Sequence, residues 1–166
     1  MAQITLKGNK IHTEGTLPKV GEKAKDFTLT TVDLGTKSLK DYEGKRLVLN
    51  IFPSVDTGVC AASVRKFNEE AAKLDNTVVL CISKDLPFAQ KRFCAAEGID
   101  NVEMLSDFAE GSFGKDYGIL IVDGPMKGLL SRCVLILDDN HQVVYSEQVP
   151  EITEEPNYDE ALNIFS

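Results

Sequence analysis

Two hydrophobic periods alternate along the chain, one typical of buried strands and one typical of amphipathic helices. Residues 47–52 and 77–82 are almost continuous apolar runs, which is the pattern of strands buried on both faces of a sheet. Between these runs, apolar residues recur every three or four positions from Val64 to Leu74. That period predicts an amphipathic helix ending at about residue 75, so this segment is predicted to be strand, helix, strand.

A second helix is predicted after the second apolar run, because Asp85 and Pro87 are typical of a helix start and Gly98 of a helix end. The whole order predicts an α/β fold of the thioredoxin-like kind: a mixed central sheet flanked by helices on both faces, with an N-terminal β-hairpin. The other predicted elements are a hairpin over residues 4–13, strands over 27–31, 37–39 and 102–105, a weak helix over 108–117, a hairpin formed by 132–137 and 142–149, and a helix over about 158–165.

The composition is that of a soluble globular domain. The chain has 166 residues without an internal repeat or a linker-like stretch, which predicts one domain over residues 1–166. Hydrophobic residues make up 43% of the chain and charged residues 27%. The formal net charge is −8, and an acidic surface repels phosphate backbones and anionic lipids. Nucleic acid and membrane surfaces are therefore disfavoured as partners.

No targeting or membrane segment is expected. The N-terminus lacks a basic patch followed by an apolar stretch, and no apolar run approaches the ~20 residues of a transmembrane helix. The expected location is the cytoplasm. In that reducing compartment cysteines stay free thiols unless one of them is catalytic or redox-sensing.

The chain has four cysteines: Cys60, Cys81, Cys94 and Cys133. They are too few and too widely spaced for a disulfide scaffold, and no C-x-x-C pair indicates a zinc ribbon or a thioredoxin-type redox motif. Cys81 and Cys133 lie in apolar segments predicted as strands, so both are predicted to be core thiols. Cys60 and Cys94 lie on the two predicted helices.

Cys60 occupies a position where chemistry is often placed, at the turn between a buried strand and a helix. If Thr57 caps this helix, Cys60 is its third residue and lies in the first turn, where free N–H groups and the helix dipole favour thiolate over thiol. Pro53 at the strand exit would hold the turn in one shape. The alternative is that Cys60 is a small buried hydrophobe at a helix start. Position alone leaves both interpretations open.

The segment from Pro53 to Cys60, Pro-Ser-Val-Asp-Thr-Gly-Val-Cys, resembles the active-site region of bacterial thiol peroxidases, which are atypical two-cysteine peroxiredoxins. The peroxiredoxin pattern Pro-x-x-x-Thr-x-x-Cys is matched by Pro53, Thr57 and Cys60. The resemblance extends along nearly the whole chain. It includes Asp-Leu-Pro-Phe-Ala-Gln at residues 85–90, which leads to Phe-Cys at 93–94, and the arginine that opens a strand at position 132.

The resemblance implies a role for each residue of the site. Cys60 would be the peroxidatic cysteine, which attacks the peroxide O–O bond, and Cys94 the resolving cysteine, which closes an intrachain disulfide. Thr57 would hydrogen-bond peroxide and thiolate, Arg132 would hold the thiolate and polarise the departing oxygen, and Pro53 would shield the site from water. These types suit the chemistry, which needs a thiolate and donors for charge leaving on oxygen.

The resemblance also implies partners. The substrates would be hydrogen peroxide and organic hydroperoxides, thioredoxin would reduce the disulfide, and the protein would be a homodimer. No metal, haem or flavin is implied. Cys60 and Cys94 lie on different predicted helices, and a disulfide needs Cα atoms within roughly 7 Å. If the reduced form holds them farther apart, one or both helices must unwind locally before the disulfide forms.

Two other functions remain open from the residues. A redox sensor could use the same thiol pair without turnover. A thioredoxin-type dithiol–disulfide oxidoreductase is the other candidate, and the missing C-x-x-C motif argues against it. His12 and His141 are the only histidines, and neither shows the spacing of a metal site or an obvious pairing with a nucleophile.

Overall fold

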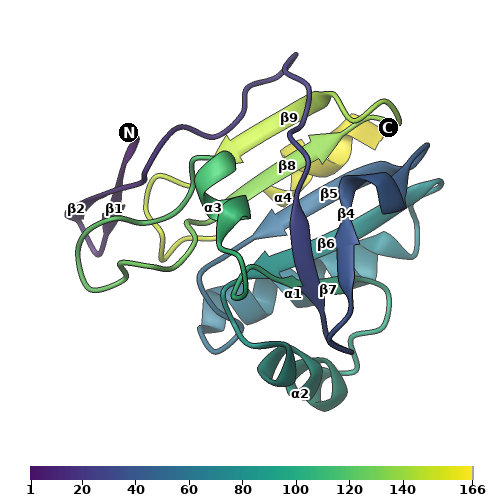
Figure 1. Cartoon of the computed structure of the whole chain (residues 1–166), viewed down its shortest axis with the longest axis horizontal. Coiled ribbons are helices and arrows are strands. Elements are labelled where there is room, and N and C mark those ends of the chain that lie inside the picture. Colours follow the sequence, from purple (N-terminus) through teal and green to yellow (C-terminus); the bar gives the residue numbers. More distant parts are fainter. Residues whose placement is uncertain (166) are drawn as a thin grey trace.

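The computed structural model describes residues 1–165, in which a mixed seven-stranded sheet carries helices on both faces (Figure 1). The strand order is β4-β3-β7-β6-β5-β8-β9, and β1 and β2 form a separate two-stranded sheet. The predicted thioredoxin-like fold is therefore confirmed in its architecture. The elements are β1 (Gln3–Leu6), β2 (Asn9–His12), β3 (Thr28–Thr31), β4 (Thr36–Ser38), the 3-10 helix η1 (Leu39–Tyr42), β5 (Arg46–Ile51), α1 (Gly58–Ala71), β6 (Thr77–Ser83), α2 (Pro87–Glu97), β7 (Glu103–Ser106), α3 (Ser112–Asp116), β8 (Cys133–Leu137), β9 (Val143–Gln148), α4 (Tyr158–Leu162) and the 3-10 helix η2 (Asn163–Phe165).

The two apolar runs form the centre of the sheet as β5 and β6. These strands are parallel, because α1 crosses over between them and returns the chain to the same edge. On its other side β5 pairs antiparallel with β8, in a register that sets Ile51 opposite Cys133. This register brings the exit of β5 beside the entry of β8, although the two lie far apart in the sequence.

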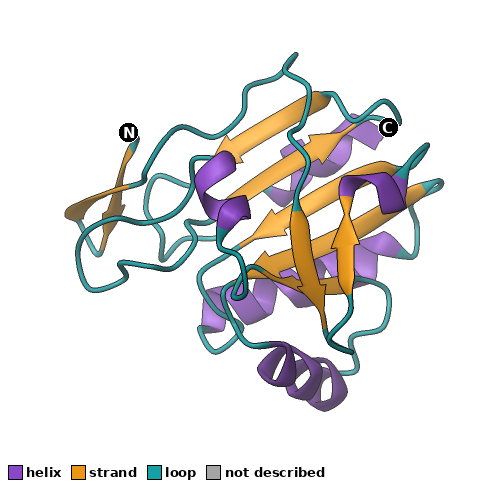
Figure 2. Cartoon of the chain, viewed as in Figure 1, coloured by secondary structure: helices purple, strands orange, loops and turns teal. Residues whose placement is uncertain are grey.

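Helices lie on both faces of the central sheet (Figure 2). Alternating side chains of the central strands build one core on each face. On β5, Leu47, Leu49 and Ile51 face a core that is closed by residues of α3 and η1. Val48 faces the second core, which is closed by α1 and α4. Both faces of β5 are thus fully buried, which explains why its sequence lacks the polar alternation of a half-exposed strand.

Three predicted helices have different ends in the structure. Helix α1 ends at Ala71, earlier than the period suggested, and Leu74 packs against the core from the following turn. Helix α3 begins only at Ser112, because Gly111 has a left-handed conformation (φ 69°) at its start. The last helix changes to a 3-10 turn after Leu162. The other predicted elements are confirmed with ends shifted by one or two residues.

No helix among residues 1–165 is long and apolar enough to cross a membrane.

The β1–β2 hairpin lies apart from the main sheet (Figure 1) and has a small apolar core of its own. Ile4 and Ile11 pack there against Ile121 and Ile152. The hairpin is therefore attached to the segment that follows β9, which includes Ile152.

The carboxylate of Glu151 fastens the hairpin turn to that segment. It accepts hydrogen bonds from the backbone N–H groups of Gly8 at 2.8 Å and Lys7 at 3.1 Å, and from both the N–H and the hydroxyl of Thr153. These donors, first of all the Gly8 N–H, lower the pKa of Glu151 to about 2. The carboxylate keeps these bonds over the whole neutral range, so the hairpin stays in place at working pH.

We expect Leu49→Ala to destabilise the protein by about 2–5 kcal/mol, because it leaves a cavity at the centre of the fully buried strand β5. Urea unfolding followed by circular dichroism measures the change. Val20→Ala is the matched control, since Val20 is 63% exposed and its truncation should cost less than about 0.5 kcal/mol. Equal costs at the two positions would contradict this assignment of the core.

Candidate active site

The first turn of α1 holds Cys60 as the sequence predicted. The chain leaves β5, passes the buried Pro53 and enters the helix at Thr57, whose extended backbone (φ −97°, ψ 144°) is that of an N-cap. The Thr57 hydroxyl oxygen accepts a hydrogen bond from the Cys60 N–H at 3.4 Å, and the hydroxyl donates to the Ser54 carbonyl at 3.2 Å. Cys60 is fully buried, so its thiol is held in a dry environment beside the positive end of the helix.

Arg132 is a second charged group of the site, and it is 97% buried since only 3% of its surface is exposed. Its Nε donates to the Ile152 carbonyl at 2.9 Å, which fixes the plane of the guanidinium. Its Nη1 is buried and has no hydrogen-bond partner within residues 1–165. Because β8 pairs with β5 in the register described above, Arg132 lies beside the exit of β5, next to Pro53. A buried donor without a partner is costly, so this one is available for a ligand.

A small pocket of about 220 Å³ unites three of the predicted site residues, Pro53, Thr57 and Arg132. The exposed surface of the pocket is mostly apolar. The remaining lining residues are Leu6 of the hairpin, Gly58 and Val59 of the first turn of α1, Met126, Ile152 and Thr153. Cys60 directly follows the stretch of α1 that lines the pocket. The pocket is thus a mostly apolar opening that Cys60 itself does not line, although Gly58 and Val59 of the same helical turn do.

Tyr158 is a further residue near this site that the sequence analysis did not identify. Burial raises the pKa of its hydroxyl, as does the Glu155 carboxylate, to which the hydroxyl donates at 3.0 Å. The positive charge of Arg132 acts in the opposite direction, and Tyr158 packs against the core cluster that contains Cys60. Only the folding of the C-terminal helix onto α1, where Tyr158 packs edge-to-face on Phe67, brings it there. No sequence motif marks it.

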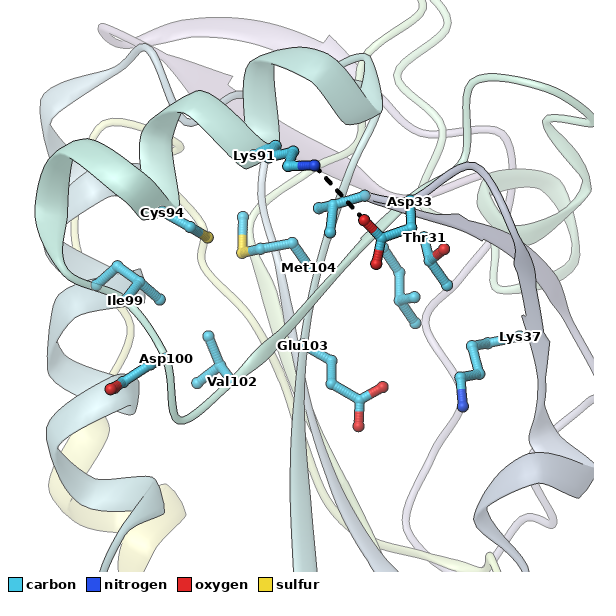
Figure 3. A pocket seen from close by; sticks show the side chains of 12 residues that line it. Thr31, Asp33, Lys37, Lys91, Cys94, Ile99, Asp100, Val102, Glu103 and Met104 are labelled. Atoms are coloured by element: carbon cyan, nitrogen blue, oxygen red, sulfur yellow. Dashed lines mark ion pairs between the residues drawn. The ribbon is translucent and has the colours of Figure 1, made fainter.

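Cys94 lies elsewhere, on α2, and faces a different pocket. This pocket has a volume of about 470 Å³, and no residue of the segment 53–60 lines it. Figure 3 shows the Cys94 thiol turned toward Met104 and the pocket, with the ion pair between Lys91 and Asp33 above it. Burial raises the pKa of Cys94. Both Cys60 and Cys94 are free thiols, and the structure does not bring them together in one pocket.

Cys81 and Cys133 are the core thiols that the sequence predicted. Both are fully buried in the sheet. Burial raises the pKa of each thiol from 9.0 to about 12, although hydrogen bonds with Asn50 and Ser131, respectively, act in the opposite direction. Neither thiol lines the pocket of Pro53, Thr57 and Arg132.

The histidines lie away from the site. His12 pairs with Asp123 at 2.7 Å, and the His141 ring, which is buried rather than exposed on its hairpin, bonds to the Tyr42 carbonyl at 2.9 Å. Within residues 1–165 no group of three histidine, cysteine or acidic side chains is arranged to hold a metal ion.

The chain belongs to the Redoxin family, whose pattern matches residues 19–162. It is 57% identical to a thiol peroxidase of Corynebacterium glutamicum over 162 residues, covering 98% of both chains. It is 59% identical to a thiol peroxidase of Mycobacterium bovis, covering 98% of this chain and 97% of the relative. The fold matches the crystal structure of a peroxiredoxin-like protein from Aquifex aeolicus with a TM-score of 0.93 and 43% identity, covering 99% and 96% of the two chains.

These relatives confirm the predicted resemblance to thiol peroxidases and support an enzyme that reduces peroxides with a thiol. The roles of individual residues are a separate matter, because family membership does not assign them.

The two core thiols predict how stability changes with pH. Both stay protonated in the folded protein up to about pH 12, whereas unfolded thiols ionise from their ordinary value of 9.0. The unfolded state therefore binds fewer protons above pH 9, and the free energy of unfolding falls as pH rises, by about 1.4 kcal/mol per unit for each thiol.

Urea unfolding of the reduced protein at pH 8, 9 and 10 measures this slope. The double variant Cys81→Ala, Cys133→Ala should be less stable at pH 8 but should show a clearly smaller slope between pH 9 and 10. A slope unchanged from the parent protein would show that these thiols ionise in the folded state.

Proposed function

We propose that Cys60 is the peroxidatic thiol of this enzyme and that Cys94 resolves its oxidised form as an intrachain disulfide. The observation that carries the proposal is the buried Arg132, which has a partnerless Nη1 and lines the same pocket as Thr57 and Pro53, at the first turn of the helix that holds Cys60. A buried cation, a helix N-terminus and a hydroxyl beside one thiol are the environment that stabilises a thiolate.

In the first step the Cys60 thiolate attacks the terminal oxygen of a hydroperoxide. The S–O bond forms as the O–O bond breaks, which leaves a sulfenic acid on Cys60 and an alkoxide that takes up a proton to become an alcohol. Arg132 Nη1 is a donor for the charge that develops on the departing oxygen, and the Thr57 hydroxyl becomes a second one when it turns from the Ser54 carbonyl, to which it donates in the structure. Pro53 supports this by closing the pocket to water, since it is buried and brings no N–H group.

In the second step the Cys94 thiolate attacks the Cys60 sulfenic sulfur. The S–S bond forms and hydroxide leaves, which combines with the proton lost by Cys94 to give water. Because the two thiols face different environments, α2 and the first turn of α1 must rearrange before this attack. The raised pKa of Cys94 keeps it protonated until α2 opens, so it does not compete for peroxide.

A dithiol protein of the thioredoxin type would then reduce the disulfide, in a compartment such as the cytoplasm that keeps thiols reduced. The family resemblance supports this reductant and a homodimeric state. Light scattering coupled to size-exclusion chromatography measures the oligomeric state. A peroxide assay coupled to thioredoxin and its reductase tests the reductant.

We expect Cys60→Ser to abolish peroxide consumption, because the nucleophile is lost, and Cys94→Ser to consume one equivalent of peroxide and then stop at the sulfenic acid. The coupled assay and mass spectrometry with a sulfenic-acid trap measure both outcomes. After one equivalent of peroxide, peptide mapping of the parent protein without reductant should find a bridge between Cys60 and Cys94.

Cys81→Ala is the matched control, since Cys81 is a buried thiol outside the pocket, and it should retain turnover. A bridge that forms only between chains would overturn the role of Cys94. Oxidation without turnover under any reductant would favour a redox sensor over an enzyme.

The apolar pocket also predicts substrate preference. Met126→Ser should lower kcat/KM for cumene hydroperoxide about tenfold, because an aryl or alkyl group loses apolar contact at the pocket wall, and should leave hydrogen peroxide within about twofold. Val20→Ser, at a site 63% exposed and outside the pocket, should change neither rate. Equal losses for both peroxides would show that Met126 acts on Cys60 rather than on the organic group.

A further inference from the structure

The Asp85 carboxylate joins the segment that carries Cys60 to the segment that leads into α2. One of its oxygens accepts a hydrogen bond from the Ser54 hydroxyl at 2.7 Å. The other accepts from the Val55 N–H at 2.9 Å and from the Ser83 hydroxyl at 2.6 Å. Ser54 and Val55 belong to the turn between Pro53 and Thr57. Asp85 lies between β6 and the start of α2, so it holds two loops that follow neighbouring strands.

Gln90 extends this network into α2. Its side chain is fully buried, and its Nε2 donates to the Ser83 hydroxyl at 3.3 Å and to the Leu105 carbonyl of β7 at 2.9 Å. Its Oε1 is buried without a hydrogen-bond partner within residues 1–165. Gln90 lies one helical turn before Cys94, so the bonds that hold Gln90 also hold the turn that carries Cys94.

A second contact connects the same two segments, but it is exposed. Arg92 of α2 and Asp56 approach to 3.9 Å, with 72% and 71% of their side chains exposed. An ion pair of this kind contributes little in water. The chain formed by the half-buried Asp85 and the fully buried Ser83 and Gln90 is therefore the stronger connection between the loop of Cys60 and the helix of Cys94.

We propose that Asp85 and Gln90 are positioning residues that couple the two cysteine segments, so that α2 and the Cys60 loop open together. This proposal rests on the proposed function, in which Cys94 must reach Cys60. We call the three residues Asp85, Ser83 and Gln90 the clasp. While the clasp is closed, Asp85 orders the loop for attack on peroxide, and Gln90 keeps α2 folded and Cys94 away. Opening of the clasp is required for disulfide formation.

Two isosteric substitutions act on the two ends of the clasp. Gln90→Glu removes both donated hydrogen bonds and sets a second carboxyl group near Asp85, so α2 opens more easily. The sulfenic acid on Cys60 should then convert to the disulfide about tenfold faster, with the first oxidation step within about twofold of the parent rate. Asp85→Asn leaves too few acceptors for its three donors, so the loop shifts and the first step should slow about tenfold.

Quenched-flow mass spectrometry of the reduced proteins after one equivalent of peroxide measures both steps. Arg92→Gln is the matched control, because it removes the exposed contact between the same segments, and both steps should stay within about twofold. If Gln90→Glu resolves at the parent rate, or if Arg92→Gln accelerates resolution as much, the clasp does not control opening and the proposal is wrong.

Hydrogen exchange in the reduced Gln90→Glu variant tests the coupling itself and does not depend on peroxide. The Val55 amide donates to the Asp85 carboxylate, whereas the amides of Thr57 and Cys60 donate to Ser54 and Thr57 of the same segment. They should exchange about tenfold faster, together with those of α2, while those of β5 stay protected. A faster exchange confined to α2 would overturn the coupling.

The two proposals fail in different ways. If the parent protein forms no bridge between Cys60 and Cys94, the proposed function is wrong, and hydrogen exchange still tests whether the clasp links the two segments. If the bridge forms but exchange and resolution in Gln90→Glu match those of the parent, only the clasp is wrong.

Discussion

The pairing of β5 with β8 is the constraint on which the site depends. It sets Ile51 opposite Cys133, and one step further it brings Arg132 beside the turn that leads to Cys60. A guanidinium is costly to bury, and this one is buried with a fixed Nε and a partnerless Nη1. The fold holds it there because β5 and β8 are fixed by two cores, one on each face of the sheet. The packing that stabilises the sheet therefore also holds the Arg132 guanidinium in place.

Cys60 and Cys94 differ because their surroundings differ. Cys60 is fully buried in the first turn of α1, whereas Cys94 lies half-buried within α2, with burial as the cause of its raised pKa. Cys81 and Cys133 lie inside the sheet, where burial raises both pKa values and, at Cys133, the neighbouring Arg132 acts in the opposite direction. The chemistry of the four cysteines therefore depends on their position in a helix, on nearby charge and on exposure to solvent.

Most of the fold and part of the site could be predicted from the sequence. Apolar runs and turn residues identify the strands, and the N-cap of Thr57 follows from a local pattern that the structure confirms. Tyr158 could not be found, because its approach depends on how α4 packs on α1. The end of α1 was misplaced, since Leu74 keeps the apolar period while lying beyond the helix. Local features such as an N-cap can be predicted from the sequence, whereas contacts between distant segments can be identified only from the tertiary fold.

The long-range register of β5 and β8 also has a kinetic consequence. The paired residues lie more than 80 positions apart in the chain, and contacts of such separation form slowly because the intervening loop must first be closed. During synthesis Cys60 and Cys94 leave the ribosome well before Arg132 does. A growing chain therefore carries Cys60 and Cys94 before the cation, and the pocket of Pro53, Thr57 and Arg132 is complete only when β8 docks.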